Sequence, residues 1–137
     1  IQVITNLLDS PGALKRFEGP AKPREIAAAA HRRGVGVMGI RAVQAGALTS
    51  EFDRQLPDDH PDLADYRRAA AFRDLSRELG ESPAALAHRY ALSMDGVATV
   101  VLGVKNRAEL EECVEAEAKG RLAPEVMARI DGTVVRG

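Results

Sequence analysis

Three short apolar runs divide the chain and predict its β-strands. The first covers residues 1–5, where valine, isoleucine and threonine favour an extended backbone. The second covers residues 35–40, and the third covers residues 97–102, which are rich in β-branched side chains and lack polar alternation. A continuous apolar run of this kind is typical of a strand covered on both faces. The pattern therefore predicts three short, buried strands.

Apolar residues at helical spacing predict helices between and after these strands. The first helix is expected to begin near Pro23, because proline suits a first turn, and to end at Gly34, which tolerates a left-handed stop. Within it, Ile26, Ala27 and Ala30 recur at helical spacing. One longer helix is expected over residues 61–79, ended by Gly80. Its apolar face would consist of Phe72, Leu75 and Leu79.

Clear capping signals mark the helices that follow. Ser82 and Pro83 form a good cap and first turn, and Asn106 with Glu109 three positions later has the spacing of a capping box. A last short helix is expected from Pro124. The expected inward residues are Leu86, Tyr90, Ala91 and Met94 in the first of these helices, Leu110, Cys113 and Val114 in the second, and Val126, Met127 and Ile130 in the third.

Turn-forming residues place loops at 9–12 and 19–20, and a long polar loop is expected over 49–60. The remaining order is strand, helix, strand, helices, strand, helix. Repeated βαβ units require parallel strands and right-handed crossovers. The chain is therefore expected to form one α/β domain over residues 1–137.

Composition narrows the function classes. The 137 residues are 45% hydrophobic and 28% charged with a formal net charge of −1, which fits a globular protein and shows no electrostatic footprint for nucleic acid. No apolar run approaches the roughly 18 residues of a membrane span, and no signal peptide is visible. The lone Cys113 gives neither a disulfide nor a metal cluster, so a cytoplasmic location and no metal site are expected. Because the chain opens at Ile1 directly in a strand, we expect it to be a fragment.

Ligands of parallel α/β folds bind at the carboxyl ends of the strands, and this chain offers three such ends. The clearest candidate site follows the third strand. Gly103 there permits close approach of a ligand, and Lys105 and Arg107 add positive charge beside a capped helix start. A phosphate site and an ordinary tight turn both fit this segment. Arg41, after the second strand, fits either an anion site or a salt bridge.

Other polar residues leave similar alternatives. Gln2 and Asn6, on and after the first strand, could bind an amide or serve as structural caps. Each of the three histidines lies apart from any nucleophile pattern and is interpreted as structural or solvated, and Cys113 as a packed thiol. The two tyrosines, Tyr66 and Tyr90, lie on predicted helices and are interpreted as packing residues. No glycine-rich Rossmann or P-loop signature is present.

Several of these segments resemble the aldo-keto reductase family. Residues 34–49, Gly-Val-Gly-Val-Met-Gly-Ile-Arg-Ala-Val-Gln-Ala-Gly-Ala-Leu-Thr, resemble the strand that ends in the family's Tyr-Ser-Pro-Leu turn and leads to Gly-Leu-Leu-Thr. Residues 79–92 are similar to the next barrel helix, and residues 100–112, with Val-Val-Leu-Gly-Val-Lys-Asn-Arg, to its Ile-Pro-Gly cofactor motif. Residues 2–6 fit the strand whose glutamine contacts the nicotinamide amide. The resemblance covers nearly the whole chain in the family's order.

The resemblance implies a partial (β/α)₈ TIM barrel, with three parallel strands and flanking helices that form the last three of its eight strands. It also implies an enzyme that reduces a small carbonyl substrate with NADP or NAD. The family's catalytic Asp, Tyr, Lys and His come from earlier strands, so no catalytic residue is expected here. The cofactor-binding residues implied by the resemblance are Gln2, Ile40, Arg41, Gly103, Val104, Lys105, Asn106, Glu109 and Cys113.

The chain departs from the family pattern at several of these positions. Ile40 replaces an aromatic that stacks on the nicotinamide, Arg41 a serine, Ala42 a proline, and Cys113 an asparagine that meets the adenine. The proline of Ile-Pro-Gly is Leu102. We therefore expect weak cofactor binding. Two functions follow: the cofactor-holding part of a reductase, inactive by itself, or a non-catalytic dinucleotide-binding sensor or subunit.

The barrel interpretation also predicts association of the chain with itself. Three strands taken from a closed eight-stranded barrel have two open edges, and their inward side chains lack the opposite wall. Pairing these edges with a second copy would restore hydrogen bonds and bury apolar surface, and repacking of the helices over the exposed face is the alternative. Neither a nucleic acid nor a membrane is expected as a partner.

Overall fold

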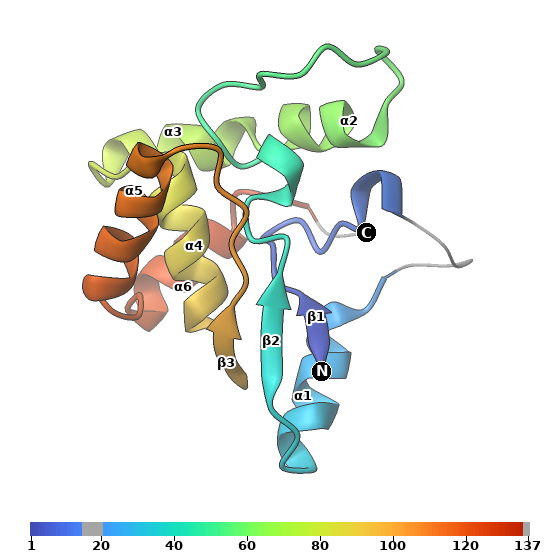
Figure 1. Ribbon diagram of the computed structural model, residues 1–137, viewed down its shortest axis with the longest axis vertical. Coiled ribbons are helices and arrows are strands. Elements are labelled where there is room, and N and C mark those ends of the chain that lie inside the picture. The colour runs from blue at the N-terminus through green and yellow to red at the C-terminus, as the bar shows by residue number, and fades with distance from the viewer. Residues whose placement is uncertain (15–20, 136–137) are drawn as a thin grey trace.

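The computed structural model describes residues 1–14 and 21–135, and it contains the predicted parallel sheet. Strands β1 (Gln2–Ile4), β2 (Val37–Ile40) and β3 (Val97–Val100) pair in that order, each parallel to its neighbour (Figure 1). The predicted α/β class, with three parallel strands and flanking helices, is therefore confirmed. The loop signal at Gly19-Pro20 lies outside the described residues.

Proline opens many of the helices, as the sequence predicts. Four of the six α-helices in the described residues have proline in the first turn, and the Oγ of Ser82 accepts a hydrogen bond of 3.0 Å from the amide of Ala85. The α-helices are α1 (Pro23–Arg32), α2 (Pro61–Arg68), α3 (Ala70–Glu78), α4 (Pro83–Ser93), α5 (Arg107–Ala118) and α6 (Pro124–Asp131). Two 3₁₀ turns, η1 (Gly12–Leu14) and η2 (Gln44–Gly46), complete the set.

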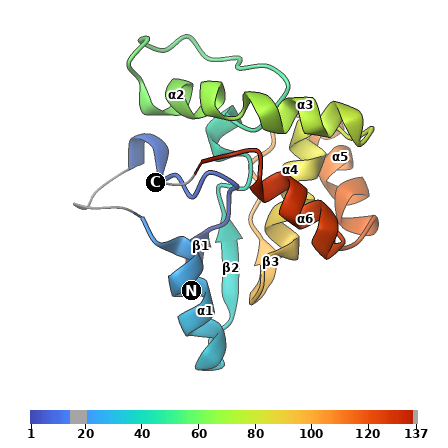
Figure 2. The same cartoon turned by 180° about the vertical axis from the view of Figure 1, so that it is seen from behind.

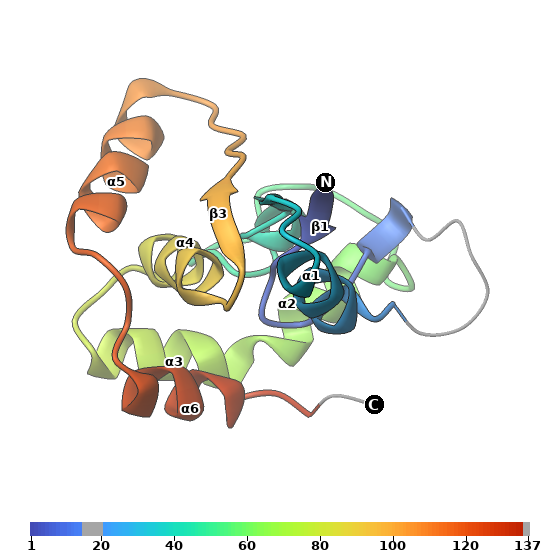
Figure 3. The same ribbon diagram turned by 90° about the horizontal axis from the view of Figure 1, so that it is seen from below.

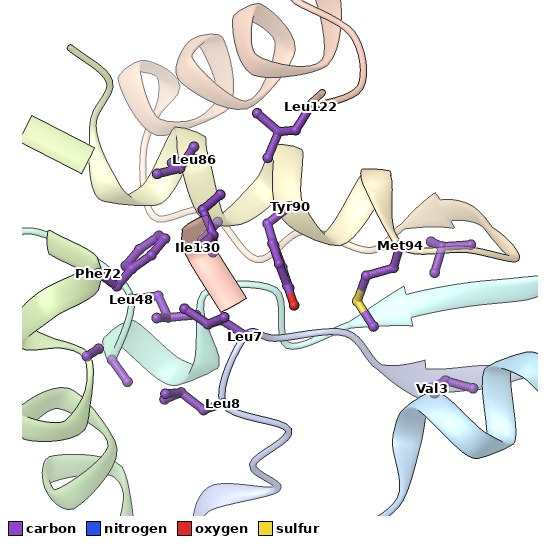
Figure 4. Packing of buried hydrophobic residues seen from close by; sticks show 14 of the residues in the cluster. Val3, Leu7, Leu8, Leu48, Phe72, Leu86, Tyr90, Met94, Leu122 and Ile130 are labelled. Atoms are coloured by element: carbon purple, nitrogen blue, oxygen red, sulfur yellow. The ribbon is translucent and has the colours of Figure 1, made fainter. Parts of the chain in front are cut away.

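Different helices pack on the two edges of the sheet. Helix α1 packs on β1 and β2, whereas α4 packs on β3 with α3 and α5 beside it (Figures 1 and 3). Figure 2 shows α6 in front of α4 and close to α3. The core lies between these layers, where Tyr90 of α4 meets Phe72 of α3 and Ile130 of α6 (Figure 4). Each of those three side chains is fully buried.

The predicted single helix over residues 61–79 is wrong: it breaks at Ala69, whose ψ of 11° is not helical. The break leaves the carbonyl of Tyr66 to accept a 2.7 Å hydrogen bond from the Arg73 guanidinium, which also lies 3.8 Å from the centre of the Tyr66 ring. The two halves serve different surroundings. Asp62 and Asp65 of α2 are buried among polar groups, whereas α3 buries Phe72 in the core. A continuous apolar face could not serve both.

Coverage of the third strand on both faces is also contradicted. Only Val97 is buried in β3, Ala98 and Thr99 are exposed, and the strand ends at Val100. The predicted continuation, Val101 and Leu102, is 46% and 38% exposed. No described element packs on that side of β3, so the apolar run there is not satisfied within this chain.

The inward face expected for α5 is correct only in part. Cys113 is buried, but Leu110 and Val114 are 46% and 59% exposed. They lie on the side of α5 that no other described element covers. The outer edges of β1 and β3 likewise have no strand partner among the described residues.

Candidate functional site

A cleft of about 630 Å³ opens at the carboxyl end of β3. One wall is η2 with the loop that follows it, and the other is formed by the start of α4, the start of α5 and the segment that joins β3 to α5. Figure 1 shows this loop extending over the end of the sheet from which the β3–α5 segment rises. The cleft brings together five of the predicted cofactor residues: Gly103, Val104, Lys105, Glu109 and Cys113.

The start of α5 is capped as predicted, with one difference in detail. Asn106 Oδ1 accepts from the amide of Glu109 at 2.9 Å. The Glu109 carboxylate reaches back to the amide of Lys105 at 2.8 Å, one residue before the cap that a capping box would use. Gly103 lies next to open space, because an added Cβ there would meet nothing within 4 Å. The backbone is thus fixed at α5 and accessible at Gly103.

An ion pair joins the two walls at the mouth of the cleft. The Lys105 ammonium contacts the Asp53 carboxylate from the loop, and it lies 3.5 Å from Glu109 Oε1. Lysine and aspartate affect each other: the hydrogen bond to Lys105 lowers the pKa of Asp53, and the same bond raises the pKa of Lys105. The cation expected to meet a ligand is therefore already neutralised by a carboxylate.

The part of the cleft away from Asp53 is lined by two uncharged side chains and a carboxylate. His88 of α4 and Cys113 of α5 are both buried in its wall, and the Ser82 hydroxyl donates to the Glu112 carboxylate. Burial lowers the pKa of His88, which a nearby Glu112 partly opposes, and burial raises the pKa of the Cys113 thiol. Both groups are uncharged near neutral pH.

Sequence reasoning interpreted His88 as structural or solvated and did not place it beside this cleft. The signal was present in its surroundings, since an ionisable side chain follows four consecutive small or apolar residues, 84–87, on one helix. His60, in contrast, is structural: its Nδ1 caps α2 by accepting from the amide of Asp62 at 3.2 Å.

Gln2 and Ile40 lie away from this cleft. They line a second groove of about 570 Å³, together with Ile26 and Ala29 of α1. Gln2 is exposed at the amino end of β1, and its amide lies 3.9 Å from the sulfur of Met38. The structure therefore does not bring these two predicted cofactor residues together with Lys105.

Arg41 is held in a buried polar network after β2. Its Nε donates to Gln44 Oε1 at 2.9 Å, and its guanidinium lies 3.8 Å from the buried carboxylate of Asp62. Gln44 in turn donates to Asp65 Oδ2 at 2.8 Å and accepts from Asn6 at 3.1 Å. The structure thus shows Arg41 in an ion pair, and it shows Asn6 in a structural role.

The backbone of this turn is unusual as well. Arg41, Gln44 and Ala45 have φ of 59°, 48° and 52°, a region that side chains other than glycine rarely adopt. Such conformations persist only where the surroundings impose them. Here the hydrogen bonds of the buried Gln44 side chain hold the turn in this conformation.

Comparison with known proteins bears on the whole chain. The profile of the Aldo/keto reductase family matches residues 1–134. The chain belongs to the aldo-keto reductase family. This confirms the resemblance drawn from residues 34–49, 79–92 and 100–112.

Solved aldo-keto reductases share the fold. The holo form of aldo-keto reductase AKR11C1 from Bacillus halodurans matches with a TM-score of 0.67 and 23% identity, covering 100% of this chain and 43% of that one. Its apo form matches with a TM-score of 0.61 and 24% identity, covering 84% of this chain and 40% of that one. This chain therefore spans less than half the length of these reductases. The comparison with curated proteins found no match.

No helix in the described residues has the length and apolar character to cross a membrane. No group of three or more histidine, cysteine, aspartate or glutamate residues there is arranged to hold a metal ion.

Proposed function

We propose that the cleft at the end of β3 holds the phosphate-bearing part of NADP or NAD, and that the chain is the cofactor-holding part of an NAD(P)H-dependent aldo-keto reductase. One observation carries the proposal: a glycine, a lysine and a capped helix start converge on one cleft at the carboxyl end of a parallel strand. When bound, the dinucleotide supplies the hydride that reduces a carbonyl compound.

The residues fit such a ligand. The cap uses the amide of Glu109, while no hydrogen bond among the described residues engages the amides of Arg107 and Ala108. These first-turn amides attract a phosphate oxygen, with Lys105 adjacent. Gly103 leaves room for the ligand against the backbone. A cleft of about 630 Å³ is also within the usual size range of cofactor sites.

The proposal assigns roles to the predicted residues. Gly103, Val104 and Lys105 contact phosphate and ribose, Asn106 and Glu109 hold the helix start, and Cys113 lies toward the base. Gln2, Ile40 and Arg41 stay predictions for the nicotinamide end, supported only by the family resemblance. We further propose that the catalytic acid of the reductase lies outside this chain, and that the protein is cytoplasmic, consistent with its lone buried cysteine.

The ion pair between Lys105 and Asp53 favours the alternative of a sensor or subunit that binds dinucleotide without turnover. A phosphate must displace the Asp53 carboxylate before it reaches the lysine. Binding then responds to the loop that carries Asp53. The presence or absence of the catalytic Asp, Tyr, Lys and His in the parent barrel separates the two functions.

Calorimetric titration of the chain with NADPH tests the proposal. Lys105→Glu places a negative charge beside the phosphate and should weaken binding about fivefold, which corresponds to about 1 kcal/mol in a partly hydrated site. Lys119→Glu makes the same charge change at the far end of α5 and should leave affinity unchanged. Equal affinities for both variants, or no binding by the wild-type chain, would contradict the proposal.

A further inference from the structure

Both edges of the sheet are open, and an apolar surface lies beside each of them. Neither β1 nor β3 has a strand partner on its outer side among the described residues. Beside β1, the groove of about 570 Å³ lies between the strand and α1, and Ile26 of α1, which lines it, is 52% exposed. Beside β3, the exposed apolar side chains are Val101, Leu102, Leu110 and Val114. An open strand edge flanked by apolar side chains is a surface to which another chain can add a strand.

The two edges fit each other in direction. All three strands are parallel, so β3 of one copy can pair with β1 of a second copy and extend the sheet without reversing it. Helix α5 packs on α4, which separates it from α1 of the same copy (Figure 3). Since the helix that follows a parallel strand crosses toward the next strand with a right-handed turn, α5 would lie over the seam between the two copies. Its outer face would then enter the groove beside α1 of the second copy.

The helices beside the two edges have opposite charges. Helix α5 contains five glutamates and one arginine, whereas α1 with its flanking Lys22 and Arg33 has four lysine or arginine residues and one glutamate. Arg33 follows Ile26 by seven residues, or about two helical turns, and Glu117 follows Leu110 by the same interval. Aligning the two apolar residues of parallel helices therefore places the arginine and the glutamate at one level. Both charged residues are exposed, and neither forms an ion pair within residues 1–14 and 21–135.

We infer that the chain pairs head to tail with a second copy, so that β3 and the outer face of α5 of one copy dock against β1 and α1 of the other. Leu110 and Val114 then pack against Ile26 in the groove, and Glu117 meets Arg33. Pairing of like edges would instead bring two acidic helices together, and like charges across an interface oppose binding. Because each copy presents one edge of each kind, the contact joins two different surfaces, as in ring-forming assemblies.

Two variants, each with one blocked edge, test the head-to-tail contact by sedimentation at micromolar concentration. One carries Leu110→Lys and Val114→Lys, and the other carries Ile26→Lys, because a lysine that must be buried in an apolar contact opposes docking. Each variant should be a monomer by itself. An equal mixture should form dimers, since the intact α5 edge of one variant meets the intact α1 edge of the other and the two lysine-bearing edges repel each other. Ala28→Lys, on an exposed side of α1 outside the groove, is the control and should associate like the wild type.

Charge reversal gives a second test that leaves the apolar residues in place. Glu117→Arg and Arg33→Glu should each weaken association about threefold, the size expected of an exposed ion pair, and the double variant should recover it. These two positions are exposed, so this test decides if a blocked variant does not fold.

Several outcomes would overturn the inference. A wild-type monomer would show that no second copy covers the edges. A blocked variant that dimerises by itself would show that like edges meet, and a mixture that stays monomeric would show that unlike edges do not. Unchanged association in both reversals, or a double variant weaker than either single variant, would exclude the contact between Glu117 and Arg33. Binding of NADPH is measured separately, so none of these results bears on the proposed function.

Discussion

The guanidinium of Arg24 donates a 2.5 Å hydrogen bond to the hydroxyl of Tyr90, which lies 66 residues away in the sequence. The same hydroxyl donates to Asp131 Oδ1 at 2.5 Å, so one buried side chain links α1, α4 and α6. The Tyr90 ring is fully buried in the core. This tyrosine therefore ties the last helix to the first.

Tyr90→Phe should lower the free energy of unfolding by about 1–2 kcal/mol, because it removes both hydrogen bonds while keeping the ring. Tyr66→Phe is the control, since its hydroxyl makes one exposed hydrogen bond to the carbonyl of Ser50. Urea denaturation measures both variants. Equal losses would show that the Tyr90 hydroxyl contributes no more than an exposed one.

The same residue predicts a dependence of stability on pH. Burial, reinforced by the bond to Asp131, raises the pKa of Tyr90 from 10.0 to about 12 in the folded chain. The unfolded chain therefore loses this proton first as the pH rises, so the stabilisation is complete below pH 10 and is lost between about pH 10 and 12. Urea midpoints across that range should fall for the wild type and fall less for Tyr90→Phe. Parallel curves would contradict this assignment.

Gly12 is expected to be irreplaceable in the polar network. Its φ is 54°, and a Cβ added there would lie 2.2 Å from Asp62 Oδ1 and 2.6 Å from Gln44 Nε2. Gly34, with φ of 69° and no atom within 4 Å, is the matched control for backbone strain alone. Gly34→Ala should cost about 1 kcal/mol, and Gly12→Ala clearly more. Chemical denaturation measures the free energy of unfolding of both variants. Equal losses for Gly12→Ala and Gly34→Ala would show that the polar network accommodates the added Cβ.

Much of the fold could be predicted because caps, stops and strands are local signals. Ser82, Asn106 and Gly34 act as expected, and the three parallel strands follow from the order of the apolar runs. The break at Ala69 could not be predicted, because it depends on the Arg73 guanidinium donating to the carbonyl of Tyr66, seven residues earlier. Val101, Leu102 and Val114 are apolar like core residues, yet all three are exposed in the described chain.

The candidate site was predictable to a similar extent. Gly103 and Lys105 follow a strand and precede a capped helix, a local arrangement that fits an anion site or a tight turn. The ion pair of Lys105 with Asp53 joins residues 52 positions apart, and no local pattern contains it. Arg41 was left open between anion site and ion pair, and only the packing of α2 beneath it distinguishes the two.

Neutralising Asp53 should strengthen cofactor binding. Asp53→Asn frees the Lys105 ammonium, and because both groups are exposed the gain is small, up to about fivefold in affinity for NADPH. Glu111→Gln removes an equal charge from an exposed pair with Arg107 and should leave affinity unchanged. A weaker Asp53→Asn complex in calorimetry would show that Asp53 helps to hold the ligand.

The chain by itself should not reduce carbonyl compounds. Hydride transfer needs an acid that protonates the developing alkoxide, and we propose that this acid lies outside the chain. The rate of NADPH oxidation with an aromatic aldehyde should equal the rate without protein. Protein-dependent oxidation that survives Lys105→Ala and Lys105→Glu would point to a contaminant, whereas oxidation abolished by them would contradict the prediction.

We also propose that the chain associates with itself through its uncovered apolar surface. Each such side chain left in water forfeits roughly 1.5–3 kcal/mol, which is large against the net stability of a domain. The double variant Leu110→Lys, Val114→Lys should shift the sedimentation coefficient toward that of the monomer. Glu115→Lys, on the same helix, should not. A wild-type monomer at micromolar concentration would contradict self-association.

Backbone amide resonances during titration with NADPH test the central claim most directly, because they locate the ligand as well as detect it. The largest shifts should fall on residues 103–109, on Asp53 and on His88, with small shifts at Gln2 and Ile26. Shifts concentrated in the groove beside β1, or no shifts at millimolar NADPH, would contradict the claim that the cleft after β3 holds the dinucleotide.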